Sequence, residues 1–352
     1  MSDRRAFINA VAGAVPDHDV HRIFIDWAEQ RIEDPRARRL FLRMADRSGI
    51  EHRWSVLPAA AGGGRPDFYL GEAPATSARM KLYAEAAPRL ALRAIANLGA
   101  LASLDGITHL VVASCTGFVA PGIDQIVARE LGLDGVERTL VGFMGCYAAV
   151  SVLRLAHHIV RSEPEARVLA VTVELCSLHL QDTQNVESLL AQLQFSDGAA
   201  AALVTSEPAG FATRELFALP LPGSDRLIQW NIGDTGFEMV LSGEVPGRIQ
   251  HALEDAAVRL AVLNGWSAEE VDAWAVHAGG RSILDAVEKG LELPQGALFA
   301  SRDVLARYGN MSSSTLMFVL AELMAKPGAD RGVAIAFGPG LAAEGFRFER
   351  AA

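Results

Sequence analysis

Three residues that lie far apart in the sequence could together handle a thioester: Cys146, His277 and Asn310. Cys146 follows a glycine and opens an apolar segment predicted to be helical, where the positive end of the helix dipole favours thiolate over thiol. A nearby histidine would favour the thiolate further. The Asn310 amide can donate to an oxygen that acquires negative charge. These residue types suit acyl transfer to Cys146, then carbon–carbon bond formation through the enolate of a decarboxylated malonyl thioester.

Each of the three residues also has an ordinary interpretation. A free cysteine is commonly an inert core residue, a histidine at a strand end is often structural, and an asparagine before a helix is a common N-cap. A Cys-His-Asn set also occurs in cysteine proteases, but the residues around Cys146 do not match their motifs. Cys115 and Cys176 lack so clear a helix-start setting, so we expect them to line a cavity or to lie in the core.

The elements that would position these residues occur twice. The first set comprises strands at 109–113, 139–141 and 167–173 and helices from about 122 and at 148–160. The second set comprises strands at 273–277 and 332–337 and helices at 281–289 and 313–324. Gly145-Cys146 and Gly309-Asn310 are 164 residues apart, and the strands beginning near 168 and 332 have the same offset. This register predicts an internal duplication that places Cys146 and Asn310 at equivalent helix starts.

The remaining N-terminal sequence and the division of the chain follow from simpler patterns. Residues 20–48 have helical spacing, 59–66 form a breaker rich in Ala and Gly, and 75–100 form a long helix. We expect an N-terminal half over 1–210 that carries the nucleophile, and a C-terminal half over 211–352 that carries the histidine and the asparagine.

Composition excludes several classes of protein. The 352 residues are half apolar and carry a formal charge of −10, which argues against general nucleic-acid binding. The three cysteines do not suggest a disulfide framework, and no CxxC or HExxH motif suggests a metal site. The sequence has no signal peptide pattern and no apolar run of membrane-spanning length. We therefore expect a cytoplasmic protein without a metal.

Several motifs together resemble the type III polyketide synthases, the chalcone synthase-like family, in its bacterial type within the thiolase-fold condensing enzymes. They occur in the family's order over about residues 35–350, and any one alone would be weak. They are Gly142–Ala149, Gln194–Ala201, Glu244–Gly247, Val276–Gly280, Tyr308–Ser313 and Phe337–Gly340. The resemblance implies an α/β protein with a five-layered αβαβα thiolase-like fold. It also implies Cys146 as the nucleophile, with His277 and Asn310 as decarboxylation and oxyanion donors.

The resemblance also implies a set of substrate-pocket residues. Phe195 corresponds to a gatekeeper between the coenzyme A tunnel and the cavity, and a second gatekeeper, Phe in plant enzymes, falls on Met239. Two cavity threonines of plant enzymes fall on Cys176 and His179, and a floor glycine aligns with Trp230, which would shrink the elongation pocket. The interface methionine of plant enzymes falls on Ala120. Within the matched motifs or beside them, we expect further pocket residues at Cys115, Ser312, Gly338 and Pro339.

Substrates and partners follow from the same resemblance. The implied substrates are an acyl-CoA starter and malonyl-CoA, with no permanently bound cofactor and no required acyl carrier protein, in a homodimer. Arg39, Arg43 and Arg47 are four residues apart on one helix face, where they would bind the phosphates of coenzyme A. A solvated charged face is the alternative. Met239 in place of Phe favours aliphatic or acetyl-type starters, which would give a resorcinol, phloroglucinol or pyrone.

Other functions share parts of this pattern. A ketoacyl-acyl carrier protein synthase III-like enzyme uses the same fold and residue types, and turnover of malonyl-CoA without carrier protein would exclude it. A non-catalytic thiolase-fold subunit of a synthase complex would not need all three reactive residues. A thiol hydrolase would release free acid rather than a carbon–carbon-bonded product.

Overall fold

The computed structural model describes residues 5–60 and 64–351, and its centre is a sheet of nine strands in the order β11-β12-β13-β8-β1-β7-β6-β4-β5. The strands are β1 (Ala6–Ala14), β4 (His109–Ser114), β5 (Glu137–Gly142), β6 (Val168–Leu175), β7 (Asp197–Thr205), β8 (Phe211–Pro220), β11 (Ala273–Val276), β12 (Arg331–Gly338) and β13 (Ala342–Arg350). Pairing is parallel in β4–β5, β4–β6 and β11–β12 and antiparallel elsewhere. Within this sheet, the strands of the two halves are joined by the short pairing of β1 with β8, from Ala6↔Thr213 to Ile8↔Phe211.

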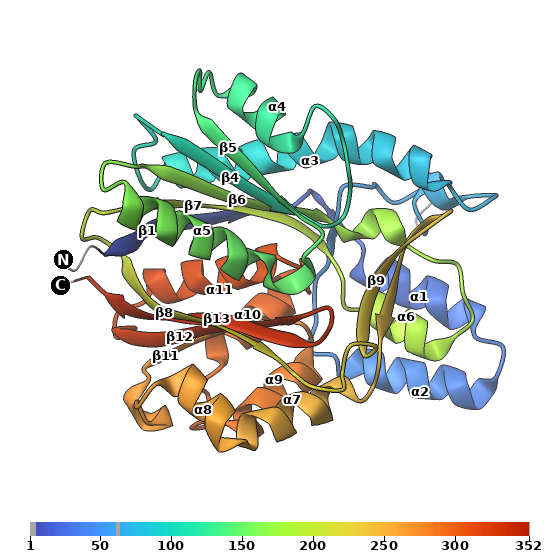
Figure 1. Cartoon of the computed structure of the whole chain (residues 1–352). Coiled ribbons are helices and arrows are strands. Elements are labelled where there is room, and N and C mark those ends of the chain that lie inside the picture. The colour runs from blue at the N-terminus through green and yellow to red at the C-terminus, as the bar shows by residue number, and fades with distance from the viewer. Residues whose placement is uncertain (1–4, 61–63, 352) are drawn as a thin grey trace.

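Helices form three layers around these two half-sheets, as Figure 1 shows. One outer layer holds α3 (Thr76–Gly99) and α4 (Ile123–Glu130), the central layer holds α5 (Ala148–Ser162) and α11 (Ser314–Ala325), and the other outer layer holds α7 (Val245–Glu254), α8 (Ala256–Leu263) and α9 (Arg281–Gly290). A buried apolar cluster fills each junction between helices and sheet. The predicted five-layered α/β fold is confirmed.

The positions of the two central helices account for the pattern of apolar residues in their sequences. α11 lies between the two half-sheets, and its residues from Ser314 to Leu320 are all buried. A helix covered on both sides is expected to be apolar around its whole circumference. In α5, by contrast, Val152, Ala156 and Val160 form a buried stripe, while His158 on the other side is exposed.

The duplication is real for the elements near the site and inexact elsewhere. β4 begins at His109 and β11 at Ala273, which is the predicted offset of 164 residues. The counterpart of β5, however, would fall at 301–306, where the chain forms the helix α10 (Phe299–Tyr308). The C-terminal half therefore contributes four strands to the sheet and the N-terminal half five.

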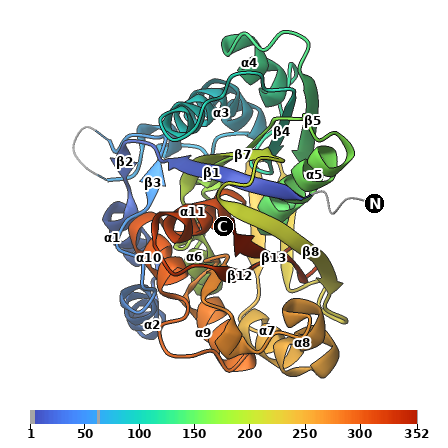
Figure 2. The same cartoon turned by 90° about the vertical axis from the view of Figure 1, so that its left-hand side faces the viewer.

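Other elements lie outside the central layers, beside one end of the sheet (Figure 2). They are β2 (His18–Asp19), α1 (His21–Arg31), α2 (Pro35–Asp46), β3 (Trp54–Ser55), α6 (Val186–Gln192) and the hairpin of β9 (Ile228–Gly233) and β10 (Gly236–Leu241). The segment 20–48 predicted as helical is two helices, because the Asp34 side chain caps α2 and Pro35 occupies its first position. Part of the predicted breaker, 61–63, lies outside the described residues. Within the described ranges, no helix combines the length and apolarity needed to cross a membrane.

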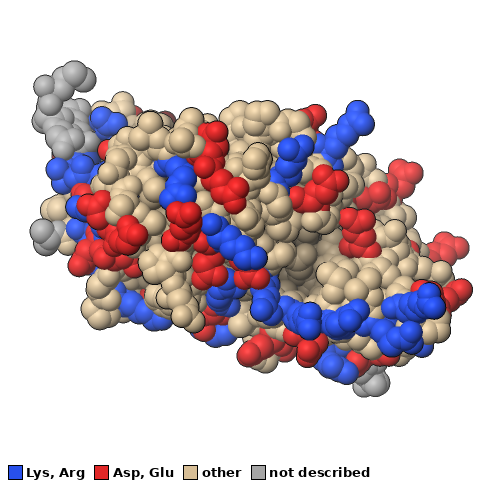
Figure 3. All heavy atoms as spheres, turned by 90° about the horizontal axis from the view of Figure 1, so that it is seen from below, with Lys and Arg blue, Asp and Glu red and all other residues tan. Residues whose placement is uncertain are grey.

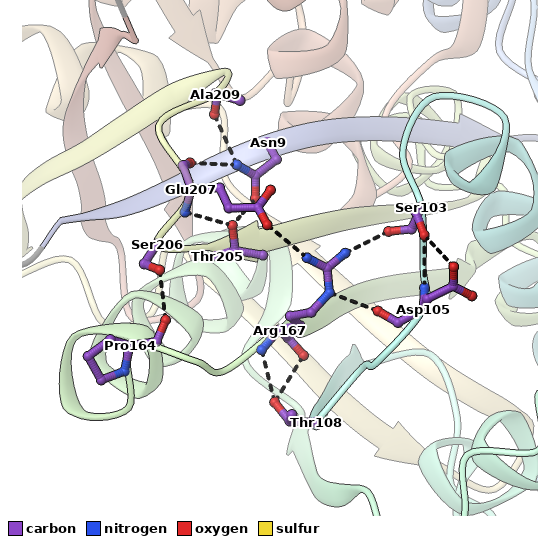
Figure 4. Close-up of polar contacts among 10 residues, drawn as sticks. All are labelled: Asn9, Ser103, Asp105, Thr108, Pro164, Arg167, Thr205, Ser206, Glu207 and Ala209. Carbon is purple, nitrogen blue, oxygen red and sulfur yellow. Dashed lines mark hydrogen bonds and ion pairs between the residues drawn. The ribbon is translucent and has the colours of Figure 1, made fainter.

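At the end of the N-terminal half-sheet away from Cys176, a polar network around Arg167 ties loops together (Figure 4). The Arg167 guanidinium donates to the carbonyl oxygens of Ser103 and Asp105, both at 2.8 Å, and pairs with Glu207 at 3.4 Å. The Arg167 amide donates to Thr108 Oγ1 at 2.9 Å. Arg167 directly precedes β6, so these bonds hold the starts of β4 and β6 in register, and the site lies at the other ends of both strands.

Candidate active site

Cys146 lies on a tight connection between β5 and α5. It is the middle residue of a single 3-10 turn, Gly145–Tyr147, that leads directly into the helix. Gly145 has φ +76°, and a Cβ at this position would lie 2.4 Å from Cδ of Pro339. A side chain at position 145 would therefore push the nucleophile loop away from the end of β12.

Two side chains from the loop before α11 surround the sulfur. Ser312 Oγ lies 3.8 Å from Cys146 Sγ, and the Asn310 side chain also interacts with this sulfur. Asn310 is itself fixed, because its Oδ1 accepts from the Ser312 amide at 2.9 Å and its Nδ2 donates to the Gly279 carbonyl at 3.2 Å. The structure thus brings together Cys146 and Asn310, which the duplication placed at equivalent helix starts.

His277 directly follows β11, and Gly279, two residues later, accepts the hydrogen bond from the Asn310 side chain. Its amide donates to the Ile335 carbonyl at 2.8 Å, and its side chain is buried. A Cβ at Gly279 would lie 3.5 Å from His277 Nε2, an ordinary contact, so Gly279 lies directly beside the ring. Neither ring nitrogen has a hydrogen-bond partner among the described residues. Buried polar groups are nearly always paired, so this imidazole is a candidate for binding a reacting group.

Burial shifts the pKa values of both the Cys146 thiol and the His277 imidazole. Burial raises the pKa of the Cys146 thiol to about 12, an effect that Ser312 and Asn310 oppose and the nearby Glu174 carboxylate increases. Burial lowers the pKa of His277 to about 3. Both shifts favour a neutral thiol and a neutral imidazole. Burial thus opposes the thiolate that is expected from the helix start.

Glu174 is a site residue that sequence reasoning missed. It lies near the end of β6, is completely buried, and accepts hydrogen bonds from Cys115 Sγ at 3.0 Å, the Cys115 amide at 3.1 Å, Thr116 Oγ1 at 2.8 Å and Ser313 Oγ. Burial raises its pKa, and these bonds oppose that shift. The one available signal was a lone carboxylate inside the apolar run of β6.

A cavity of about 430 Å³ leads away from Cys146. Of the predicted pocket residues, those that line it are Cys115, Cys176, His179, Phe195, Trp230, Met239, Ser312 and Pro339. Gly338 lies behind this wall, where a Cβ would lie 2.3 Å from the Tyr147 ring. Ala120 is exposed and does not belong to the lining. The cavity also reaches Ile23, Phe24 and Trp27 of α1. Its lining there mixes apolar and charged side chains, because Arg65 lies over the Trp27 ring and pairs with Asp182.

Trp230 and His179 form a rigid part of the wall. Trp230 Nε1 donates to the Cys115 carbonyl at 2.8 Å, and its ring meets His179 edge-on at 5.3 Å. His179 Nε2 lies 2.7 Å from the Thr116 carbonyl, and its Nδ1 accepts from the Phe237 amide at 3.0 Å. Burial lowers the pKa of His179 to about 4. Both ring nitrogens of His179 are thus already hydrogen-bonded, which makes it a neutral structural residue of the cavity.

The basic residues expected for coenzyme A lie outside the cavity. Arg39, Arg43 and Arg47 are exposed on α2 and at its C-cap, and none belongs to the cavity lining. Seen from below, Lys and Arg side chains form a row on the side of the molecule where α2 lies (Figure 3). Among the ion pairs of the described residues, none involves these three arginines. They can therefore meet an external anion.

Comparison with known proteins accounts for nearly the whole chain. Residues 2–208 match the N-terminal domain of chalcone and stilbene synthases, and residues 214–350 match the C-terminal domain. The alpha-pyrone synthesis polyketide synthase-like Pks18 of Mycobacterium tuberculosis is 33% identical over 333 residues, which are 90% of this chain and 84% of Pks18.

Solved structures of polyketide synthases are also similar to this chain. PKS-I from the brown alga Ectocarpus siliculosus has a TM-score of 0.88 at 30% identity, over 98% of each chain. The C-terminal type III polyketide synthase domain of Steely1, a type I/III hybrid from Dictyostelium, has a TM-score of 0.88 at 25% identity, over 99% of this chain and 100% of that domain.

Proposed function

This chain belongs to the chalcone and stilbene synthase family, as a type III polyketide synthase that acts on coenzyme A thioesters, and from this premise we propose which residues carry the reaction and which substrates fit. Enzymes of this family are acyltransferases that catalyse decarboxylative condensation and need no permanently bound cofactor. The observation that carries the residue assignment is that the Asn310 side chain interacts with the Cys146 sulfur and donates to the Gly279 carbonyl, two residues from His277, whose buried ring has no hydrogen-bond partner among the described residues. Of these three residues, Cys146 belongs to the cavity lining, and Asn310 and His277 lie behind it.

The first step loads the starter. The sulfur of Cys146 attacks the thioester carbonyl, the bond to the coenzyme A sulfur breaks, and coenzyme A leaves as a thiol with the proton of Cys146. The neutral ring of His277 is the candidate to hold that proton in transit, since its nitrogens make no hydrogen bond within the described chain. The buried setting excludes water, which protects the acyl-enzyme from hydrolysis.

The second step makes and uses the enolate. The bond between the carboxylate and the methylene of malonyl-CoA breaks, CO₂ leaves, and the electron pair moves into a thioester enolate. Asn310 Nδ2 and a ring N–H of His277 donate to the enolate oxygen; neutral, preorganised donors of this kind stabilise developing charge in a dry site. The enolate carbon attacks the acyl carbonyl on Cys146 and releases the sulfur for the next round.

The starter that we propose is aliphatic. Met239 stands where plant relatives have a phenylalanine, and methionine adapts to irregular apolar substrates. The apolar residues Ile23, Phe24 and Trp27 in the cavity lining offer a surface for an alkyl chain. Trp230 narrows the cavity, and a narrow cavity favours few extensions. Few extensions support a pyrone, resorcinol or phloroglucinol product. The name of Pks18, which refers to alpha-pyrone synthesis, supports the first of these.

Arg39, Arg43 and Arg47 are the groups that we propose bind the phosphates of coenzyme A. Their guanidinium groups lie on one side of α2 and are solvent-exposed, as recognition of a dissociable phosphate requires. Binding of free coenzyme A thioesters in this way needs no acyl carrier protein.

A homodimer is supported by the exposed edge of the sheet. β5 is the outermost strand of the N-terminal half, and Leu140 in it is 47% exposed. Nearby, Phe118 is also exposed and stacks on Phe143 at 5.5 Å. An uncovered strand edge with apolar side chains is a template for pairing with another strand, and we propose that β5 pairs with its copy in a second chain.

We also propose that the protein is cytoplasmic. The boundary that we propose between its two halves lies near residue 210, between β7 and β8.

The test is to incubate the purified chain with a panel of acyl-CoAs and labelled malonyl-CoA and to identify products by mass. We expect condensed, cyclised products without carrier protein, with aliphatic starters preferred over coumaroyl-CoA. Free acids as sole products would contradict the condensation, and a marked preference for coumaroyl-CoA would contradict the starter class.

A further inference from the structure

Arg53 is a buried cation next to the cavity whose role the reaction above does not explain. It directly precedes β3, is only 3% exposed, and belongs to the cavity lining. No carboxylate of the described residues forms an ion pair with it; its guanidinium instead stacks on Phe24, with Cζ 4.6 Å from the ring centroid. Asp19 and Asp197 act on the guanidinium only from beyond ion-pair distance. Burial of a charge without a direct ion pair is costly, so the chain must gain something from keeping it there.

The guanidinium holds the segment that carries Phe195. Arg53 Nη1 donates to the carbonyl oxygens of Gln192 at 3.0 Å and Phe195 at 2.8 Å, while Nε donates to His21 Nδ1 at 3.1 Å. Gln192 ends α6, where carbonyl groups lack partners within the helix. Arg53 therefore fixes the exit of the chain from α6, and with it the backbone of the proposed gatekeeper.

The same segment is joined to the loop of Asn310. The Asn310 amide donates to the Gln194 carbonyl at 2.8 Å, and the Ser196 amide donates to the Asn310 carbonyl at 2.9 Å, which forms a bridge between Phe195 and Asn310. Arg53 also touches this loop directly, because a Cβ at Gly309 would lie 2.9 Å from Arg53 Cγ. One buried guanidinium thus supports both the gatekeeper and the enolate donor.

Cys146 is held by other parts of the chain. Its turn follows β5, packs on Pro339 at the end of β12, and continues into α5. None of the hydrogen bonds described for the Arg53 side chain reaches this turn. A disturbance at Arg53 should therefore move Phe195 and Asn310 relative to the nucleophile and leave the nucleophile itself in place.

We propose that Arg53 is a positioning residue for the decarboxylating half of the reaction: by binding the carbonyls of Gln192 and Phe195, it holds Phe195 and Asn310 where malonyl-CoA loses CO₂. This inference rests on the proposed function. Removal of Arg53 should slow release of CO₂ from malonyl-CoA while loading of a starter on Cys146 continues, a split that a general loss of folding would not produce.

The experiment measures both half-reactions in the full chain. Starter loading is followed as a burst of free coenzyme A from an acyl-CoA, and decarboxylation as CO₂ from carboxyl-labelled malonyl-CoA, in wild type, Arg53→Ala and Arg53→Lys. For Arg53→Ala we expect decarboxylation to fall about 100-fold and loading to change by less than about threefold, because displacement of positioned groups by about 1 Å costs on this order. Millimolar guanidinium ion should restore part of the decarboxylation rate in Arg53→Ala and none in Asn310→Ala.

Arg79→Ala is the matched control. Arg79 is also a buried arginine, 1% exposed, and donates to the carbonyls of Leu178 at 2.7 Å and Leu180 at 3.0 Å, away from the Phe195 segment. Its loss should leave the ratio of the two rates unchanged. If Arg53→Ala does not fold, Arg53→Lys decides, since one ammonium group cannot reproduce the planar guanidinium contacts.

Two outcomes would overturn the inference, and they are distinguishable from failure of the proposed function. Equal loss of loading and decarboxylation in both Arg53 variants would show a merely structural role, and an unchanged decarboxylation rate would show no role. A wild-type chain that releases no CO₂ from malonyl-CoA would instead overturn the proposed function, and this inference with it.

Discussion

Replacement of Trp230 by alanine should lengthen the polyketide. Trp230 is held by its hydrogen bond to the Cys115 carbonyl and by edge-on contacts with His179 at 5.3 Å and Phe237 at 5.6 Å. It therefore limits the cavity as a fixed wall rather than as a mobile side chain. The alanine variant removes this wall and one hydrogen bond to Cys115, but no hydrogen bond of Cys146.

The size of the effect follows from the volumes. The cavity measures about 430 Å³, and truncation of a tryptophan in a close-packed wall frees roughly 130 Å³. One two-carbon ketide unit needs roughly 45 Å³ at the same packing density, so the variant has room for about two or three more extensions. Loss of a fully buried tryptophan costs about 3–5 kcal/mol of folding free energy; Trp230 is only partly buried, so we expect about 2–3 kcal/mol.

The assay is mass analysis of products from one acyl-CoA starter and labelled malonyl-CoA, where the label counts the extensions. Trp266→Ala is the matched control, because Trp266 packs beside Arg331 on the outer side of the C-terminal half. We expect longer products from Trp230→Ala alone. An active Trp230→Ala enzyme with an unchanged extension number would refute the idea that this wall sets chain length.

Three further results are expected. Burial raises the pKa of Cys146 to about 12 and lowers that of His277 to about 3. The rate at which iodoacetamide labels Cys146 without substrate should therefore rise about tenfold per pH unit between about pH 6 and 9. A rate that reaches a plateau by about pH 7 would instead reveal a thiolate–imidazolium pair. Replacement of Arg43 and Arg47 together by alanine should raise KM for acyl-CoA about five- to tenfold and leave KM for the matching pantetheine thioester unchanged, which steady-state kinetics would measure. A Leu140→Arg variant should sediment as a monomer. Its control, Leu101→Arg, changes a leucine that is 65% exposed on another part of the surface and should sediment like wild type. An unchanged sedimenting mass for Leu140→Arg would place the dimer contact on another face.

Much of the fold near the site was predictable, because buried parallel strands followed by glycine turns leave a strong local pattern. The strands β4, β6, β11 and β12 and the helices α5 and α11 lie where the apolar runs predicted them. The central strand β1 was not predicted, because a single apolar stretch near the N-terminus does not reveal that it will lie between β7 and β8. β8 and the hairpin β9–β10 were missed for a related reason, since polar and apolar residues mix in strands that are only half buried.

Prediction of the site residues from the sequence has the same limit. Cys146 and Asn310 could be singled out because each follows a glycine at an element boundary, and His277 because it lies at a strand end shortly before Gly279 and Gly280. Glu174 and Arg53 could not, because a charged residue gains its meaning from partners that only the fold brings near. Burial opposes the thiolate expected at Cys146, and a sequence does not show how far a thiol will be desolvated.

The most direct test of the whole account is mass spectrometry of the enzyme after brief exposure to an acyl-CoA without malonyl-CoA. The account predicts one acyl group per chain, on the peptide that contains Cys146, and none in a Cys146→Ala variant that remains folded. An acyl group found instead on Cys115 or Cys176, or retained in the Cys146→Ala variant, would contradict it.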